Sequence, residues 1–215
     1  MMPLGDDNSV RKTFPVVTYF LIAVNVLVFL SELSLGDVFI ENWAFVPARF
    51  QNDPSGNFAT IFTSMFMHGG WFHLFGNMLY LWIFGDNVED AFGSGKFLGF
   101  YLICGVGAVF SQMMFNPGST LPNVGASGAI AGVLGAYILL FPRTNIRVLV
   151  GNAITAMPAL LVIGLWFVLQ FLSGVDSLSA AQDVGGVAYM AHIGGFVVGL
   201  ALTLLFRMSS SMAGR

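Results

Sequence analysis

Ser127 is the residue of this sequence best placed to act as a nucleophile. It lies in the run GASGAIAG at Gly125–Gly132, whose other members are all small or aliphatic, so its hydroxyl is either packed between helices or open to a reaction partner. A serine hydroxyl attacks a carbonyl only when a neighbouring base removes its proton. His192, in the run AHIGG, suits that role because an imidazole gains and loses a proton near neutral pH.

Attack on a carbonyl also creates a negatively charged oxygen, which needs hydrogen-bond donors around it. The backbone N–H of Ser127 can supply one, because it lies near the start of a predicted helix, where N–H groups lack partners within the helix. Asn77 and His73 are four residues apart and share a helix face, from which both side chains could donate. We therefore expect Ser127 as nucleophile, His192 as general base and acid, and an oxyanion site formed by His73, Asn77 and Ser127.

Each of these residues also has an ordinary structural explanation. Small residues and serines commonly fill the contacts between membrane helices, which is the alternative for Ser127. A buried hydrogen bond between helices would equally explain His192, or His73 with Asn77. His68 and His73 are five residues apart, and the sequence has no His-Glu-x-x-His motif, so we expect no metal and no cofactor.

The composition is that of an integral membrane protein, surrounded by membrane lipid. Of its 215 residues, 56% are hydrophobic and 9% are charged, whereas an ordinary soluble domain is about 25% charged. The formal net charge of −3, without a block of basic residues, argues against nucleic acid as a partner. Cys104 is the single cysteine, which argues against a disulfide framework. The first apolar stretch, from Phe14 to Leu33, is long enough to remain as a span, so we expect no removable signal peptide.

Six apolar segments are long enough, or nearly so, to cross the roughly 30 Å hydrocarbon core of a membrane. They are residues 14–33, 71–85, 97–115, 124–141, a stretch within 148–175, and 184–206. We expect the second to continue to Phe92, and the fifth to begin with an interfacial lead-in. The sequence thus predicts an all-α, polytopic bundle of six transmembrane helices. It comprises a short cytoplasmic segment over residues 1–13, one domain over 14–207 and a short cytoplasmic tail over 208–215.

Basic residues predict the orientation of this bundle, because Lys and Arg prefer the cytoplasmic side of a membrane. If the six segments alternate in direction, seven of the eight basic residues fall on one side, and Arg49 falls on the other. We therefore expect both termini to be cytoplasmic. Without an organelle-targeting extension in so small a chain, we expect a multi-pass protein of a prokaryotic plasma membrane.

The residues with catalytic chemistry lie at similar depth in the predicted bundle. At 1.5 Å per residue, Ser127 is roughly 24 Å from Arg143, at the inner end of its segment. His192 is roughly 22 Å from Arg207 by the same rule, and His73 lies at a similar level on the second segment. Three separate helices thus carry polar side chains in the outer half of the membrane, which favours one shared site.

Glycine spacing predicts how the fourth and sixth segments meet. Small residues recur three or four positions apart on the fourth segment, at Gly125, Gly128, Gly132 and Gly135. On the sixth segment, Ala188, Gly195 and Gly199 share one face with His192. Small residues let membrane helices approach closely. Contact between the two stripes would bring Ser127 within hydrogen-bond reach of His192.

The first outer loop, from about Ser34 to Gly70, is long. Apolar side chains recur in it at helical spacing: Phe58, Ile61, Phe62, Met65 and Phe66. This pattern predicts an interfacial helix that lies in the membrane face, or a helix that packs on the bundle, and both alternatives stay open.

These motifs together resemble those of the rhomboid family of intramembrane serine proteases. GASG at 125–128 resembles the nucleophile signature of that family, and AHIGG at 191–195 its catalytic-histidine helix. HGGWFHLFGN at 68–77 resembles its second-span motif, and NVED at 87–90 the stretch that closes that helix. The similarity runs from about residue 14 to residue 206, in the same order along the chain.

The resemblance implies a six-helix rhomboid protease domain over residues 14–207, with a water-filled cavity open to the outer side. It implies that single-span membrane proteins enter laterally near the second and fifth spans and are cut in or near their transmembrane segment through an acyl-enzyme. Two positions differ from many members. Ala59-Thr60 stands where a Trp-Arg pair is common, and Ala131 stands where some members carry an aromatic residue against the histidine.

Two other classes of protein would also place polar groups inside a membrane. A catalytically silent protein of rhomboid fold would bind transmembrane helices without cutting them. A transporter or channel would usually show paired halves or broken helices at matching positions, which this sequence lacks. With no Asp or Glu at the depth of Ser127 in the second, fourth and sixth segments, we expect a Ser–His dyad rather than a triad.

Overall fold

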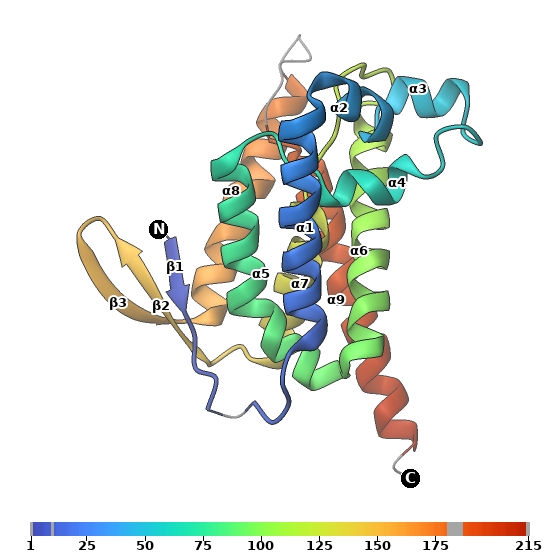
Figure 1. The fold of residues 1–215 in the computed structure, drawn as a ribbon. Helices are drawn as coiled ribbons and strands as arrows, with labels where there is room; N and C mark the ends of the chain where they lie inside the picture. The colour runs from blue at the N-terminus through green and yellow to red at the C-terminus, as the bar shows by residue number, and fades with distance from the viewer. Residues whose placement is uncertain (1, 10, 180–186, 214–215) are drawn as a thin grey trace.

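Six long helices that alternate in direction form the body of the molecule (Figure 1). The computed structural model describes residues 2–9, 11–179 and 187–213. The six helices are α1 (Val16–Leu35), α5 (Trp71–Phe92), α6 (Ser94–Phe115), α7 (Ser127–Leu140), α8 (Ala159–Ser179) and α9 (Tyr189–Ala213). Each corresponds to one predicted segment. Residues 184–186, predicted to begin the sixth segment, lie outside the described residues, and α9 continues to Ala213 within the predicted tail.

Four of these helices, α1, α6, α8 and α9, are long and apolar enough to cross a membrane, and α7 is a shorter apolar helix. At most 33% of the apolar stretch of each of the four is buried within the protein, so their remaining surface is apolar and faces outward. α5 is 22 residues long, but its last two turns contain Asp86, Glu89 and Asp90. The chain is therefore an integral membrane protein with several apolar helices.

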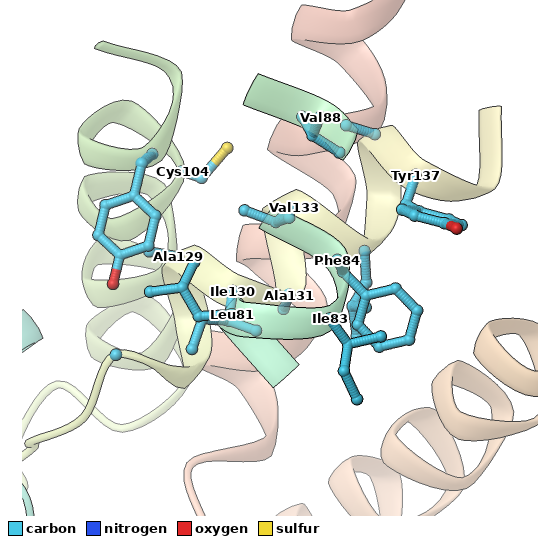
Figure 2. Packing of buried hydrophobic residues seen from close by; sticks show 14 of the residues in the cluster. Leu81, Ile83, Phe84, Val88, Cys104, Ala129, Ile130, Ala131, Val133 and Tyr137 are labelled. Carbon is cyan, nitrogen blue, oxygen red and sulfur yellow. The ribbon is translucent and has the colours of Figure 1, made fainter. Parts of the chain in front are cut away.

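Helix α7 lies at the centre of the bundle, where every residue from Gly128 to Tyr137 is buried. Figure 2 shows side chains of α5, among them Leu81 and Phe84, beside those of α7. The Phe84 and Tyr137 rings meet edge to face, with centroids 5.0 Å apart. A helix that is apolar on all sides can be surrounded by other helices, which is the position of α7.

The backbones of α7 and α9 touch where glycines face each other. A methyl group on Gly195 would overlap the carbonyl oxygen of Gly128, and one on Gly199 would overlap that of Gly132. The predicted contact between the two glycine stripes is confirmed. Because no side chain separates the two helices here, their relative height and rotation are tightly defined.

The prediction of an all-α chain is wrong, because the structure contains a three-stranded antiparallel sheet in the order β1 (Met2–Gly5), β2 (Asn145–Val150), β3 (Ala153–Pro158). Strands β2 and β3 form a hairpin whose turn contains Gly151 at a φ of 59°, a conformation that favours glycine. The residues predicted as an interfacial lead-in to the fifth span are this hairpin. In β2, Ile146 and Val148 are buried whereas Asn145 and Arg147 are exposed, which is the alternation of a strand.

The charged end of α5 holds the segment that precedes α1. The Glu89 carboxylate accepts hydrogen bonds from the backbone N–H groups of Val17 at 2.9 Å and Thr18 at 2.7 Å. These N–H groups begin α1 and have no partners within that helix. Arg11 forms an ion pair with Asp86 at 2.6 Å. The polar residues of the NVED stretch therefore tie α5 to the start of α1.

The loop between α1 and α5, predicted to be the first outer loop, crosses the end of the bundle shown at the top of Figure 1. It contains α2 (Asp37–Trp43), α3 (Pro47–Asn52), α4 (Thr60–Thr63) and a 3₁₀ helix, η1 (Ser64–Phe66). Ile61 and Met65 are buried against the bundle, whereas Phe58 is 60% exposed and Phe62 36% exposed. One face of the predicted helix thus packs on the bundle, and the other faces outward.

Arg49 anchors this loop, which lacks the Trp-Arg pair. Its guanidinium donates hydrogen bonds to the carbonyl oxygens of Glu41 and Ala44. The backbone N–H of Asn123 donates to the carbonyl oxygen of Phe45 at 2.7 Å and links the loop to the segment that leads into α7. The loop is therefore held by hydrogen bonds of Arg49 within the loop and by a backbone hydrogen bond to the segment that precedes Ser127.

Candidate active site

Ser127 and His192 meet at the ends of two helices. The Oγ atom of Ser127 lies 2.8 Å from Nε2 of His192, which is hydrogen-bond distance. Ser127 is the first residue of α7, and His192 lies in the first turn of α9. The contact between Gly128 and Gly195 is next to both residues, so the close approach of the backbones sets the distance between the two side chains.

The second nitrogen of the His192 ring also has a partner, Gln170 of α8. The Nδ1 atom of His192 lies 2.6 Å from Oε1 of Gln170. An amide oxygen can only accept a hydrogen bond, so this contact places the ring proton on Nδ1. The lone pair of Nε2 is then directed to the Ser127 hydroxyl, which donates to it.

An aromatic ring of α8 also lies against His192. The centroid of the Trp166 ring is 5.9 Å from that of His192, with 37° between the two planes. Helix α8 thus supplies an aromatic contact to His192 that Ala131 of α7 cannot make. The sequence interpretation missed both Trp166 and Gln170, although Gln170 is the only amide side chain in α8, and polar groups within an apolar helix are a signal of function.

His73 faces Ser127 from the first turn of α5. Its Nδ1 atom accepts a hydrogen bond from the backbone N–H of Gly69 at 3.3 Å, which leaves the ring proton on Nε2. A methyl group on Gly125 would lie 2.9 Å from that Nε2 and 3.5 Å from Ser127 Oγ. Gly125 also has a φ of 135°, so a residue without a side chain is needed at this position for two reasons.

Asn77 lies one turn deeper on α5 and is 8% exposed. Its amide nitrogen, Nδ2, is buried and has no hydrogen-bond partner in the part of the chain that the structure describes. A buried amide donor without a partner costs roughly 1–3 kcal/mol of stability. A donor left in this state beside a cavity is available to an acceptor that arrives with a ligand.

These residues face one cavity, which has a volume of about 600 Å³. It lies between α5, α7, α8 and the start of α9, and Ser127, His192, His73 and Asn77 all line it. Its apolar wall consists of Phe72, Tyr80, Ile130, Leu134 and Trp166. Pro122 and Asn123, which precede α7, and Val187 and Ala188, which precede α9, also line it. A cavity of this volume is large enough to receive part of a ligand, such as a few residues of an extended peptide.

The site lies below the end of its neighbour α6 because α7 is short. α7 has 14 residues and α6 has 22, and a methyl group on Gly128 would overlap Ala108 of α6. Since α6 continues for seven residues past Ala108, at 1.5 Å per residue the start of α7 lies roughly 10 Å below the last residue of α6. Residues 116–126 fill this distance, so the chain returns into the bundle before Ser127.

His68 takes no direct part in this arrangement. It is 3% exposed, its backbone N–H donates to the Glu32 carboxylate at 3.1 Å, and its ring meets that of His73 edge to face at 5.1 Å. Within residues 2–9, 11–179 and 187–213, no three His, Cys, Asp or Glu side chains gather in a way that could hold a metal ion. The structure therefore brings together the four residues selected from the sequence, and adds Gln170 and Trp166.

Comparison with known proteins finds relatives whose similarity covers the helices of this site. A model of the rhomboid domain matches residues 55–209. Over 193 residues the chain is 33% identical to Rhomboid protease GluP of Bacillus subtilis (strain 168). The aligned region covers 88% of this chain and 35% of that protein. It is 30% identical over 197 residues to Rhomboid protein 1, mitochondrial, of Saccharomyces cerevisiae. That aligned region covers 88% of this chain and 53% of the yeast protein.

A third relative is matched over more of its own length. The chain is 27% identical over 203 residues to Rhomboid protease GlpG of Salmonella newport (strain SL254). The aligned region covers 92% of this chain and 65% of that protein. This chain therefore spans between 35% and 65% of the length of these three relatives.

Proposed function

Because the chain belongs to the rhomboid family, we propose that it is an intramembrane serine endopeptidase. Its substrates are single-span membrane proteins, which it cuts in or near their transmembrane segments. The six long helices, over residues 14–207, all cross the membrane in this proposal, and both termini are cytoplasmic. The observation that carries it is the 2.8 Å contact between Ser127 Oγ and His192 Nε2 beside a cavity large enough for a peptide.

The first chemical step is attack of Ser127 on the scissile carbonyl. His192 Nε2 takes the hydroxyl proton as the Oγ–carbon bond forms, so the imidazole becomes positively charged and the carbonyl oxygen becomes negatively charged. The resting geometry supports this step, because Gln170 keeps the ring proton on Nδ1 and leaves Nε2 free to accept.

The negative oxygen is stabilised by donors from two helices. The backbone N–H of Ser127, at the start of α7, has no partner within its helix. Nε2–H of His73 and the unpartnered Nδ2 of Asn77 line the same cavity. Donors held in place before the reaction stabilise the developing charge without reorganisation, which lowers the barrier.

The peptide bond breaks when the imidazolium of His192 gives its proton to the leaving amine. This releases the C-terminal part of the substrate and leaves the N-terminal part esterified to Ser127 Oγ. A water molecule then attacks the ester carbonyl, gives one proton to His192 Nε2, and releases the acid, while the proton on Nε2 returns to Ser127. In this proposal, that water occupies the cavity beside Ser127.

Substrate entry between α5 and α8 agrees with the packing. The 600 Å³ cavity lies between these helices on the side of the catalytic residues, and a second cavity of about 100 Å³ lies between them beside β1, lined by Phe84, Leu169 and Pro3. α8 is also the least buried of the four apolar spans, with 22% of its apolar stretch buried. A transmembrane substrate must unwind locally at this gap, because a helical peptide bond is shielded by its own hydrogen bonds.

Cleavage of a model single-span substrate by the purified chain in liposomes tests the proposal. We expect cleavage by the wild type, and a loss of at least about 10³-fold with Ser127→Ala or His192→Ala. A fluorophosphonate probe should label the wild type and neither variant. Ser34→Ala, which removes an exposed hydroxyl on α1, is the matched control and should retain full activity.

The alternative function is a catalytically silent rhomboid-fold protein that binds transmembrane helices. In that case the wild type would bind the substrate without cutting it, would not be labelled, and would behave as Ser127→Ala does. The unpaired Asn77 donor argues against this alternative, because a purely binding site for apolar helices has no use for a buried donor at this depth.

A further inference from the structure

Two residues of α8 hold the His192 ring, and they are one helical turn apart. Trp166 lies against the face of the ring, and Gln170 binds its Nδ1 edge at 2.6 Å. With Ser127 at Nε2, both ring nitrogens are engaged. Among the described residues, the hydrogen bonds of this ring involve no carboxylate, and the acceptor at Nδ1 is a neutral amide.

The acceptor at Nδ1 decides which nitrogen carries the ring proton. A neutral imidazole has two tautomers, and only the one with the proton on Nδ1 can accept the Ser127 proton at Nε2. Without an acceptor, the ring could place its proton on Nε2 or rotate away from the serine. A neutral acceptor can still perform this task, because it binds the N–H both before and after the ring becomes charged.

We propose that Gln170 is the positioning residue of the catalytic dyad: its amide oxygen fixes the tautomer and the orientation of His192. This inference rests on the proposed function, because it assigns a role within the same reaction. Gln170 and Trp166 both belong to α8, whereas Ser127 and His192 belong to α7 and α9. The orientation of the histidine therefore depends on where α8 lies relative to α9.

Kinetics of variants at residue 170 separate positioning from packing. Gln170→Leu removes the acceptor at similar volume, and we expect kcat to fall roughly 10- to 100-fold with KM changed less than about twofold. Gln170→Glu keeps an oxygen acceptor at the same distance along the side chain, and should return kcat to within about fivefold of the wild type. Leu172→Ala, on the exposed side of α8, controls for loss of helix packing and should leave kcat unchanged.

If Gln170→Leu does not fold, Gln170→Met repeats the test, because methionine has the same length but no amide oxygen. Equal kcat in the wild type and in the variant without the acceptor would overturn the inference. So would a Gln170→Glu variant as inactive as Gln170→Leu, since the effect would then follow from volume or packing alone.

A measurement that does not depend on cleavage distinguishes this inference from the proposed function. The chain has three histidines, so ¹⁵N-histidine NMR gives few ring signals, and His192→Ala identifies those of His192. We expect a single Nδ1–H tautomer in the wild type and in Ser127→Ala, and a mixture of tautomers in Gln170→Leu. If these tautomers are observed but the wild type cuts no substrate, the proposed protease activity is refuted and the positioning role of Gln170 stands. An unchanged tautomer in Gln170→Leu would refute the positioning role.

Discussion

At the scale of single residues, Asn77 is the clearest sign that the cavity is built for charge. Ser127 and His192 satisfy each other in the resting structure, but the Asn77 Nδ2 atom is buried without a partner among the described residues. That state lowers stability, and binding of an acceptor in the cavity would remove the cost. A carbonyl oxygen that becomes negative during the reaction would use it.

We predict that Asn77→Leu lowers kcat by roughly 10²- to 10³-fold, because one donor to the negative oxygen is lost. KM should change little, since the interaction strengthens only as charge develops. Thermal unfolding in detergent should show no loss of stability, because no existing hydrogen bond of Nδ2 is removed. Substrate cleavage and thermal unfolding are measured on the same preparation.

Asn42→Ala is the matched control for this prediction. Asn42 is an exposed asparagine on α2 whose Nδ2 already donates to the Val38 carbonyl oxygen at 2.9 Å. It should leave kcat unchanged. An Asn77→Leu enzyme with normal kcat would remove Asn77 from the oxyanion site.

At the scale of secondary-structure elements, the contact between α7 and α9 sets the distance between the two catalytic side chains. Gly195 touches the backbone of Gly128, which follows Ser127 directly. Because the neighbour of Gly195 is backbone rather than a flexible side chain, an added methyl group cannot be accommodated without a shift of one helix.

We predict that Gly195→Ala lowers the free energy of unfolding by about 1–3 kcal/mol and lowers cleavage by more than about tenfold, since the helices separate and the Ser127–His192 contact lengthens. Gly164→Ala is the matched control, because Gly164 lies in α8 and a methyl group there would have no neighbour within 4 Å. It should preserve activity and raise helix stability slightly. Equal stability of the two variants would contradict the tight backbone contact.

The sequence-based prediction of the elements was accurate for the helices and wrong for the sheet. Long apolar segments identify helices because the pattern is contained within each segment. The hairpin of β2 and β3 also carries a local signal, a two-residue Gly151-Asn152 turn between β-branched stretches. That signal was lost because its apolar residues run without a charge into the apolar residues of α8.

At the scale of the whole molecule, the helix bundle has two ends, and different segments of the chain lie at each. Figure 1 shows the first residues of α1 and the last residues of α9 at the bottom, and the loop that contains α2 and α3 at the top. Together with the distribution of basic residues, this arrangement favours a cytoplasmic location for both termini and an outer location for the loop.

We predict that a cysteine at position 55 is accessible from outside the cell and one at position 9 is not. Ser55 and Ser9 are both exposed in the structure. The background is Cys104→Ala, which removes the single, buried cysteine. In intact cells, a membrane-impermeant maleimide should label Ser55→Cys. It should label Ser9→Cys only after the membrane is permeabilised. The reverse pattern would invert the orientation and place the cavity on the cytoplasmic side.

The amino-acid sequence by itself determined the chemistry of the candidate site. Residue type, depth along a helix and glycine spacing are properties of one segment at a time, and they were sufficient to select Ser127, His192, His73 and Asn77. They also indicated that the fourth and sixth segments meet, because only small residues permit backbone contact in a membrane.

Only the tertiary structure decided which groups complete the site. Gln170 reaches His192 across 22 positions of the chain, and Met2 pairs with Leu149 across 147 positions. The rotation and height of one helix against another depend on the packing of every helix in the bundle at once. No periodicity within α8 specifies that its one amide, rather than an apolar neighbour, faces the imidazole.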